Sequence, residues 1–203
     1  MTTSFRPLDP SRPAGTERCD AARNRARVLA AAERLFAERC ISEVSMDDIA
    51  AEAGVGKGTL YRGFGDRAGL ALAVLGERDR AFQEALLRGP PPLGPGAPAP
   101  ERLAAFLQGL VDVLEANIDL LVVSENATPG ARYRTRLYDT YRLHATVLLR
   151  EIIGAEPGPL ADLVLAPLAA DLYQHLRRDR GTSPDEIKAM LGELAAWLAA
   201  YAR

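Results

Sequence analysis

Residues 45–70 read SMDDIAAEAGVGKGTLYRGFGDRAGL, and this stretch predicts two short helices joined by a glycine turn, followed at once by the start of a third helix. Ser45 is a favourable N-cap, and Asp48 three residues later completes a capping box. Gly54 is expected to end the first helix, because the left-handed conformation that often closes a helix costs least without a Cβ. The second helix is expected over residues 57–64.

The helix expected at 57–64 has one apolar and one polar face. Leu60 and Phe64 lie four residues apart, so both are expected to face inward. The opposite face is basic and rich in hydroxyl groups, and it supplies candidate DNA contacts: Lys57, Gly58, Thr59, Tyr61 and Arg62. Such side chains neutralise phosphates, reach guanine or suit the thymine methyl group, and Ser45 can bond a phosphate besides capping its helix. This face suits insertion into a DNA major groove by a helix-turn-helix at residues 45–64.

The same stretch resembles the DNA-binding segment of the TetR family of transcriptional regulators, whose pattern approximates D-I-A-x-x-A-G-V-x-x-G-T-L-Y-x-x-F-x-x-[KR]-x-x-L. The matching residues are Asp48, Ile49, Ala50, Ala53, Gly54, Val55, Gly58, Thr59, Leu60, Tyr61, Phe64, Arg67 and Leu70. The resemblance implies DNA contacts at Thr59, Tyr61 and Arg67. The chain departs from the family at Gly63, where many relatives have histidine or arginine, and at Gly69, where an acidic residue is usual.

Positive charge is scarce around this motif. The net charge of the chain is −2, and residues 41–70 hold three basic residues and five acidic ones, so the charge that binds DNA has to be local. Three arginines crowd the first turns of a helix expected from about Asp20 to Arg39, namely Arg23, Arg25 and Arg27. They either contact phosphates or form a solvated face. Arginines within residues 1–21 either reach a minor groove or do nothing specific.

Composition also predicts the domain organisation. Residues 1–21 lack apolar periodicity and are expected to form a flexible tail. Residues 22–82 are expected to form the DNA-binding domain, and residues 83–203 a second domain that contains the connector GPPPLGPGAPAP at 89–100. Proline removes a backbone donor and fixes φ, so this connector is expected to be neither helix nor central strand.

Apolar residues recur at helical spacing through both domains, and no strand alternation or hairpin dipeptide appears. One long helix is expected over 67–87, capped by Asp66. Further helices are expected near residues 100–116, 117–125, 131–153, 159–178 and 183–202, the last with a capping box of Ser183 and Glu186. The predicted fold is all-α, with an N-terminal three-helix helix-turn-helix domain and a C-terminal helical domain for effector binding and dimerisation.

The last two predicted helices carry more apolar surface than one small domain easily buries. Pairing with a second copy in a four-helix bundle would cover it, and the TetR resemblance implies the same. The interface candidates are Leu168, Leu172, Leu176, Leu191, Leu194, Trp197 and Leu198. Burial within the subunit is the alternative.

Aromatic and aliphatic residues of the second domain are numerous enough to line a cavity between helices. The candidates for this effector pocket are Phe106, Leu110, Glu125, Asn126, Tyr138, Tyr141 and His144. Glu125, Asn126 and His144 are the expected hydrogen-bonding groups, while each apolar candidate can instead be plain core. The expected ligand is a small apolar or amphipathic effector.

The sequence does not favour other chemistries. His144 and His175 are the only histidines and have no partners at ligand spacing, so no metal site is expected. No nucleophile elbow, phosphate-binding loop or zinc-protease motif occurs, so neither catalysis nor a cofactor is expected. Cys19 and Cys40 form no disulfide framework, and no apolar run reaches the length of a membrane span, so a cytoplasmic protein is expected.

These observations favour a homodimeric transcriptional regulator that binds DNA sequence-specifically. The expected mechanism is a repressor that a small effector releases from a palindromic operator. Two alternatives remain open: a helical small-molecule-binding protein or enzyme with a non-functional helix-turn-helix, and a regulator that acts without an effector.

Overall fold

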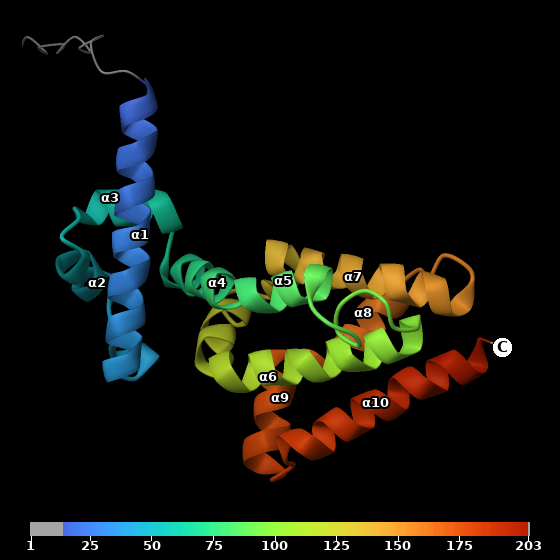
Figure 1. The fold of residues 1–203 in the computed structure, drawn as a ribbon. Coiled ribbons are helices and arrows are strands. Elements are labelled where there is room, and N and C mark those ends of the chain that lie inside the picture. The colour runs from blue at the N-terminus through green and yellow to red at the C-terminus, as the bar shows by residue number, and fades with distance from the viewer. Residues whose placement is uncertain (1–13, 203) are drawn as a thin grey trace, which may run out of the picture. The chain divides into compact units, whose positions relative to one another are not determined.

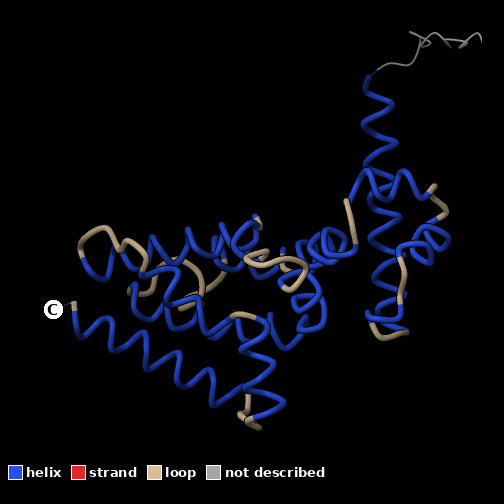
Figure 2. Tube along the Cα trace, turned by 180° about the vertical axis from the view of Figure 1, so that it is seen from behind, coloured by secondary structure: helices blue, strands red, loops and turns tan. Residues whose placement is uncertain are grey.

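The computed structural model describes residues 14–202, and these form helices and connecting loops without a strand (Figures 1 and 2). The predicted all-α class is confirmed. The chain falls into two compact units that adjoin in sequence at Asp66 and Arg67, whereas the predicted domain bounds stay predictions. Residues 1–13 of the predicted tail lie outside the described residues. Within the described part, none of the helices combines the length and the apolarity of a membrane span.

The first unit contains the two helices of the predicted helix-turn-helix. Its elements are α1 (Ala14–Glu38), the 3-10 helix η1 (Ile41–Glu43), α2 (Met46–Ala53) and α3 (Lys57–Phe64). Ile49 of α2 and Leu60 of α3 are fully buried in its core. The prediction that the first helix starts at Asp20 is wrong, because α1 already includes Ala14. Residues 14–20 contain no proline, the residue that most strongly stops a helix.

The second unit packs around the long helix α6. Its elements are α4 (Arg67–Arg78), α5 (Arg80–Arg88), α6 (Ala99–Glu125), η2 (Arg132–Arg134), α7 (Arg136–Ile153), α8 (Leu160–Leu165), η3 (Ala166–Leu168), α9 (Ala170–Gln174), the π-helix η4 (His175–Asp179) and α10 (Pro184–Tyr201). Helix α6 contacts α4, α7, α9 and α10, and Figure 1 shows α10 running beside it. Its side chains Leu103, Phe106 and Leu107 are fully buried.

Two predicted helices are interrupted. The helix predicted over 67–87 is divided at Asp79, whose side chain is buried and accepts a hydrogen bond from Gln83 at 2.8 Å. The helix predicted over 159–178 is broken into α8, η3, α9 and η4. The cause of the second break is Pro167 in η3, which has no N–H to continue an α-helical ladder.

Helix α6 joins the two helices predicted at 100–116 and 117–125 and retains a bend between them. The bend lies at Asn117, which has the non-helical angles φ −137° and ψ 17°. Its buried side chain donates to the Val113 carbonyl oxygen at 3.0 Å and accepts from Arg78 Nη1 at 3.1 Å. These bonds fix the bend and tie α6 to the last turn of α4.

The connector predicted over residues 89–100 is without helix only as far as Pro98, because Ala99 and Pro100 already belong to α6. Proline is tolerated in the first turn of a helix, where its missing N–H has no intrahelical partner to lose. One further expectation is confirmed. Helix α10 starts with the predicted capping box, in which the Glu186 amide donates to Ser183 Oγ at 3.2 Å and the Ser183 amide donates to Glu186 Oε2 at 2.7 Å.

Candidate functional site

Residues at both ends of α2 fix its start and its turn into α3. The Asp48 amide donates to Ser45 Oγ at 3.1 Å, and the Ser45 amide donates to Asp48 Oδ2 at 3.0 Å, so the predicted capping box is present. Hydrogen bonds from the Ser45 side chain and backbone lower the pKa of the Asp48 carboxyl group. Gly54 closes α2 at φ 60° and ψ 40°, and the Val55 amide donates back to the Ala50 carbonyl oxygen at 3.0 Å.

Helix α3 buries one side and exposes the other, as its pattern predicts. Leu60 is fully buried, whereas the predicted contact residues Lys57, Gly58, Tyr61 and Arg62 are exposed and Thr59 is half-buried. Ser45 is exposed at the start of α2. Arg67 is half-buried at the start of α4, which belongs to the second unit. The exposed set supplies two cations, a hydroxyl group and a position without a side chain.

Lys57 is held by an acidic neighbour. Its Nζ lies 2.5 Å from Asp47 Oδ2, in an ion pair that joins the starts of α2 and α3. The hydrogen bond to this carboxylate raises the pKa of Lys57. A phosphate that contacts Lys57 therefore has to take the place of Asp47 or share the ammonium group with it.

The three arginines of α1 have different partners. Arg27 Nη2 donates to the Gly54 carbonyl oxygen at 3.1 Å and so binds the C-terminus of α2. Arg23 pairs with Asp20 at 2.6 Å on the exposed side. The Arg25 guanidinium lies over the Phe64 ring, 5.0 Å from its centroid. The sequence left phosphate contact and a solvated face open for these arginines, and it did not foresee the bond from Arg27 to Gly54. Arg25 is the arginine that lies beside α3.

A groove of about 330 Å³ runs between α1 and α3, and sequence reasoning did not identify all of its residues. It is lined by Ala21, Asn24, Arg25, Val28, Thr59, Arg62, Gly63 and Phe64. Gly63 has open space where a Cβ would be, so the absent side chain at this position contributes to the hollow. Asn24 and Arg25 lie four and three positions before the apolar Val28, so the three residues share one face of a helix. This spacing is the sequence feature that could have placed them on the side of α1 that faces α3.

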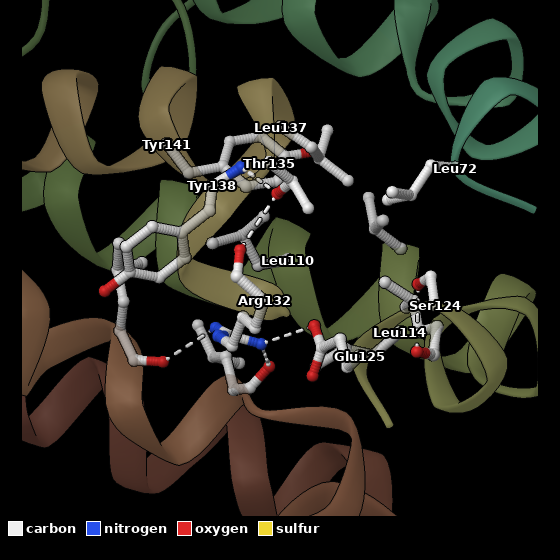
Figure 3. A pocket seen from close by; sticks show the side chains of 14 residues that line it. Leu72, Leu110, Leu114, Ser124, Glu125, Arg132, Thr135, Leu137, Tyr138 and Tyr141 are labelled. Carbon is white, nitrogen blue, oxygen red and sulfur yellow. Dashed lines mark hydrogen bonds and ion pairs between the residues drawn. The ribbon is translucent and has the colours of Figure 1, made fainter. Parts of the chain in front are cut away.

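The second unit contains a cavity of about 50 Å³ between its helices (Figure 3). Half of the lining residues are leucines, and the full lining is Leu72, Leu110, Val113, Leu114, Leu121, Ser124, Glu125, Arg132, Thr135, Leu137, Tyr138, Tyr141, Leu165 and Leu168. Of the predicted effector residues, Leu110, Glu125, Tyr138 and Tyr141 are in this lining. Asn126 instead lines a polar surface pocket of about 320 Å³.

An ion pair whose two side chains are 14% and 12% exposed forms the polar wall of the cavity. Arg132 Nη1 lies 2.8 Å from Glu125 Oε1, and the same guanidinium donates to the carbonyl oxygens of Leu168 at 2.7 Å and Leu165 at 3.1 Å (Figure 3). Glu125 Oε2 accepts from the Ala170 amide at 2.9 Å. Burial raises the pKa of Glu125, and the positive charge of Arg132 opposes this rise. Sequence reasoning selected Glu125 but not Arg132, which is seven positions away along an irregular segment.

The remaining predicted pocket residues form an aromatic cluster. The Phe106 ring centroid lies 4.8 Å from that of His144 and 5.9 Å from that of Tyr141, and the Phe82 centroid lies 6.1 Å from that of Tyr141. Burial lowers the pKa of His144 to about 4, and Arg102 acts in the same direction. The imidazole is therefore neutral near pH 7 and packs as an aromatic side chain.

The predicted interface residues differ in exposure within one subunit. Leu172 and Trp197 are 41% and 71% exposed, whereas Leu168 and Leu191 are buried. Leu176, Leu194 and Leu198 are half-buried. Other exposed apolar side chains on the same terminal helices are Leu163, Met190 and Tyr201.

No cluster of three or more metal-ligating side chains occurs among the residues that the structure describes. His175 lies 2.8 Å from Asp179 on the exposed side of η4, and this pair has no third ligand. The described part of the chain therefore offers no donor set of the kind that holds a zinc ion.

Comparison with known proteins finds similarity in and around the helix-turn-helix. Residues 28–74 match the model of the family described as bacterial regulatory proteins, tetR family. Over 62 residues the chain is 45% identical to the HTH-type transcriptional regulators SAB2452 and SAUSA300_2515, from Staphylococcus aureus strains bovine RF122 / ET3-1 and USA300. Each alignment covers 30% of this chain and 33% of the relative, so the chain matches about a third of the length of these relatives.

Solved structures share the fold over most of the chain. A tetR-family transcriptional regulator from Streptomyces coelicolor is 21% identical with a TM-score of 0.57, covering 88% of this chain and 81% of that chain. NalD of Pseudomonas aeruginosa, the secondary repressor of the MexAB-OprM multidrug efflux pump, is 22% identical with a TM-score of 0.53, covering 87% and 95%. At such identities the similarity shows the fold alone.

Proposed function

Because residues 28–74 match the tetR family of bacterial regulatory proteins, we propose that the chain is a DNA-binding transcriptional regulator of this family, a homodimeric repressor that a small effector releases from a palindromic operator. The observation that carries this proposal is the exposed basic and hydroxyl-bearing face of α3, held by a fully formed helix-turn-helix. The matched family consists of regulatory proteins, so we propose a regulator and not an enzyme.

In the proposed complex α3 enters the major groove. Tyr61 and Arg62 are its exposed hydrogen-bond donors, and Thr59 borders the groove between α1 and α3. Arg25 and Asn24 of α1 line the other side of the groove between α1 and α3. A phosphate of the DNA backbone can therefore lie between these two helices. Arg25 thereby supplies positive charge that residues 41–70 lack.

Reading a palindrome requires two copies. Two α3 helices must lie about one DNA turn apart, ~34–36 Å, to enter successive major grooves. Exposed Leu172 on α9 and Trp197 on α10 support an interface that pairs these helices with their equivalents in a second subunit. A symmetric dimer also doubles the limited positive charge that each subunit presents to DNA.

The cavity supports control by an effector. Its volume of about 50 Å³ is far below the ~300–1,000 Å³ of sites that hold drug-sized ligands, so an effector has to widen it. Leu72 of α4 lines the cavity, and only two residues separate the end of α3 from the start of α4. Widening that displaces α4 would change the spacing of the two α3 helices and favour release of the operator.

Selection of bound sequences from a random DNA pool tests this function. The expected result is a palindromic consensus whose half-sites are one helical turn apart. Tyr61→Phe and Lys57→Ala should both weaken binding, and Lys57→Ala should reduce the salt slope by about one. Tyr133→Phe is the control, because Tyr133 is an exposed tyrosine of the second unit. A pool without a consensus, or unchanged binding by both α3 variants, would contradict the proposal.

The small cavity favours one second candidate, a regulator that acts without an effector. Such a protein selects the same palindrome but shows no rise in melting temperature with any hydrophobic compound, whereas an effector that binds only the folded state raises it. The other alternative, a small-molecule-binding protein or enzyme with a non-functional helix-turn-helix, predicts ligand binding without an operator.

A further inference from the structure

Six polar side chains line the cavity, and five of them already have partners. Ser124 Oγ donates to the Leu121 carbonyl oxygen at 3.0 Å, and Thr135 Oγ1 donates to the Arg132 carbonyl oxygen at 3.0 Å. Glu125 and Arg132 form the buried ion pair. The Tyr138 hydroxyl donates to Asp162 Oδ1 at 2.8 Å. These groups offer little to a ligand, because a ligand would first have to break bonds within the protein.

Tyr141 is the exception. It is 7% exposed, and its hydroxyl has no hydrogen-bond partner among the described residues. An unpaired buried hydroxyl is costly, because it has lost its water without gaining a partner. Burial is the largest cause that raises the pKa of this phenol, and the charge of Asp79 adds to it. The side chain therefore stays protonated and is available both as donor and as acceptor.

Asp79 is the second unsatisfied group. Its carboxylate is 3% exposed, Oδ2 accepts from Gln83, and Oδ1 has no partner among the described residues. An aspartate at a helix N-cap usually bonds the helix amides, but Asp79 precedes α5 without such a bond. The charge of Asp79 raises the pKa of Tyr141, although neither the Tyr141 hydroxyl nor Asp79 Oδ1 has a hydrogen-bond partner among the described residues. Burial raises the pKa of Asp79, and its interactions with Tyr141 and Gln83 oppose this rise. When ionised, Asp79 places a negative charge beside Tyr141.

Resting on the proposed function, we propose that Tyr141, supported by Asp79, recognises the polar end of the effector, which is a mainly apolar molecule ending in a hydrogen-bond donor, a hydroxyl or an amine. The leucine lining takes the apolar part. When the ligand donates to the Tyr141 oxygen, the phenol proton turns towards the unpaired Oδ1 of Asp79, so both buried groups gain a partner. A carboxylate end is disfavoured, because Asp79 repels it and the cavity's cation, Arg132, is already neutralised by Glu125.

A length-matched series tests the proposal: 1-octanol, octylamine, octanoate and octane, measured by melting temperature and by calorimetric titration. The alcohol and the amine should raise the melting temperature of the wild-type protein more than octane, and octanoate should not. Tyr141→Phe should weaken binding of the alcohol and the amine roughly three- to tenfold, the factor expected for one hydrogen bond. Asp79→Asn should reduce the preference for the amine over octanoate.

Tyr138→Phe is the matched control, because Tyr138 is a tyrosine of the same helix and cavity whose hydroxyl is already bonded to Asp162. It should leave the order of the four compounds unchanged. Octanoate as the best ligand, equal effects of both tyrosine variants, or no response to any compound would overturn the inference. Each of these results leaves a palindromic consensus from the DNA pool intact, so failure of this inference is distinct from failure of the proposed DNA binding.

Discussion

Gly54 serves two purposes at the turn of the helix-turn-helix. Its φ of 60° lies in the left-handed region, which glycine adopts without the cost of a Cβ. A Cβ there would also lie 2.6 Å from Arg27 Nη2, the group that binds the Gly54 carbonyl oxygen. The sequence pattern predicted the first requirement, because it follows from local backbone geometry. The second depends on α1 packing against the turn and is visible only in the folded unit.

His144 should make stability depend on pH. Its folded-state pKa of about 4 lies below the 6.5 of the unfolded state, so the unfolded chain takes up the proton first as the pH falls. The free energy of unfolding should decrease by roughly 1–2 kcal/mol between pH 7 and pH 5 because of this residue. Urea unfolding of the wild type and of His144→Gln measures it, and the variant should lose this part of the slope. Equal slopes in the two proteins would contradict the prediction, and exposed His175→Gln is the control.

Two predicted helices are interrupted in the structure, although the spacing of their apolar residues predicted each as continuous. The apolar spacing of residues 67–87 is compatible with one helix, but Asp79 turns its carboxylate inward and the helix is divided there. The second break lies at Pro167, a residue that disfavours a helix interior. The helix over 159–178 was nevertheless predicted, because the apolar spacing continues on both sides of this proline. The bend of α6 was predicted correctly as a boundary near Asn117, although Arg78, which fixes it, is distant in sequence.

The Glu125–Arg132 pair should stabilise the junction of α6, η3 and α9. Arg132→Leu removes the partner of a buried carboxylate, and the loss should reach about 3–5 kcal/mol in the free energy of unfolding. Arg150→Leu is the control, because Arg150 pairs with Glu156 at the exposed end of α7 and such pairs contribute below about 1 kcal/mol. Urea denaturation gives both values. Similar losses in the two variants would mean that the buried pair has no special role.

At the scale of the whole molecule, each unit has its own contacts and core. The first unit carries the proposed DNA contacts, and the second carries the cavity and the exposed apolar side chains of α9 and α10. This separation fits a regulator in which ligand binding and DNA binding communicate through α4. The proposed activity also depends on a second copy of the chain, since one helix-turn-helix reads only half of a palindrome.

Trp197→Arg should therefore abolish the dimer and weaken operator binding together. Trp197 is 71% exposed in one subunit, and arginines facing each other across a two-fold interface would repel. Sedimentation velocity should show monomers, and operator affinity should fall at least tenfold, as expected when two half-sites are no longer bound jointly. Leu87→Arg, a charge at an equally exposed leucine of α5, should change neither. A dimeric Trp197→Arg protein would place the interface elsewhere.

The sequence by itself determined the all-α class, the capping boxes, the glycine turn and the exposed face of α3. These features depend on residues within a few positions of one another, so local backbone geometry and helical spacing are enough to specify them. Only the tertiary structure decided which arginine of α1 lies beside α3, which side chains line the cavity, and that Phe106 and His144 pack together outside it. Those outcomes depend on contacts between helices far apart in sequence. The same is true of Tyr141 and Asp79, whose unsatisfied groups become apparent only when every other partner is in place.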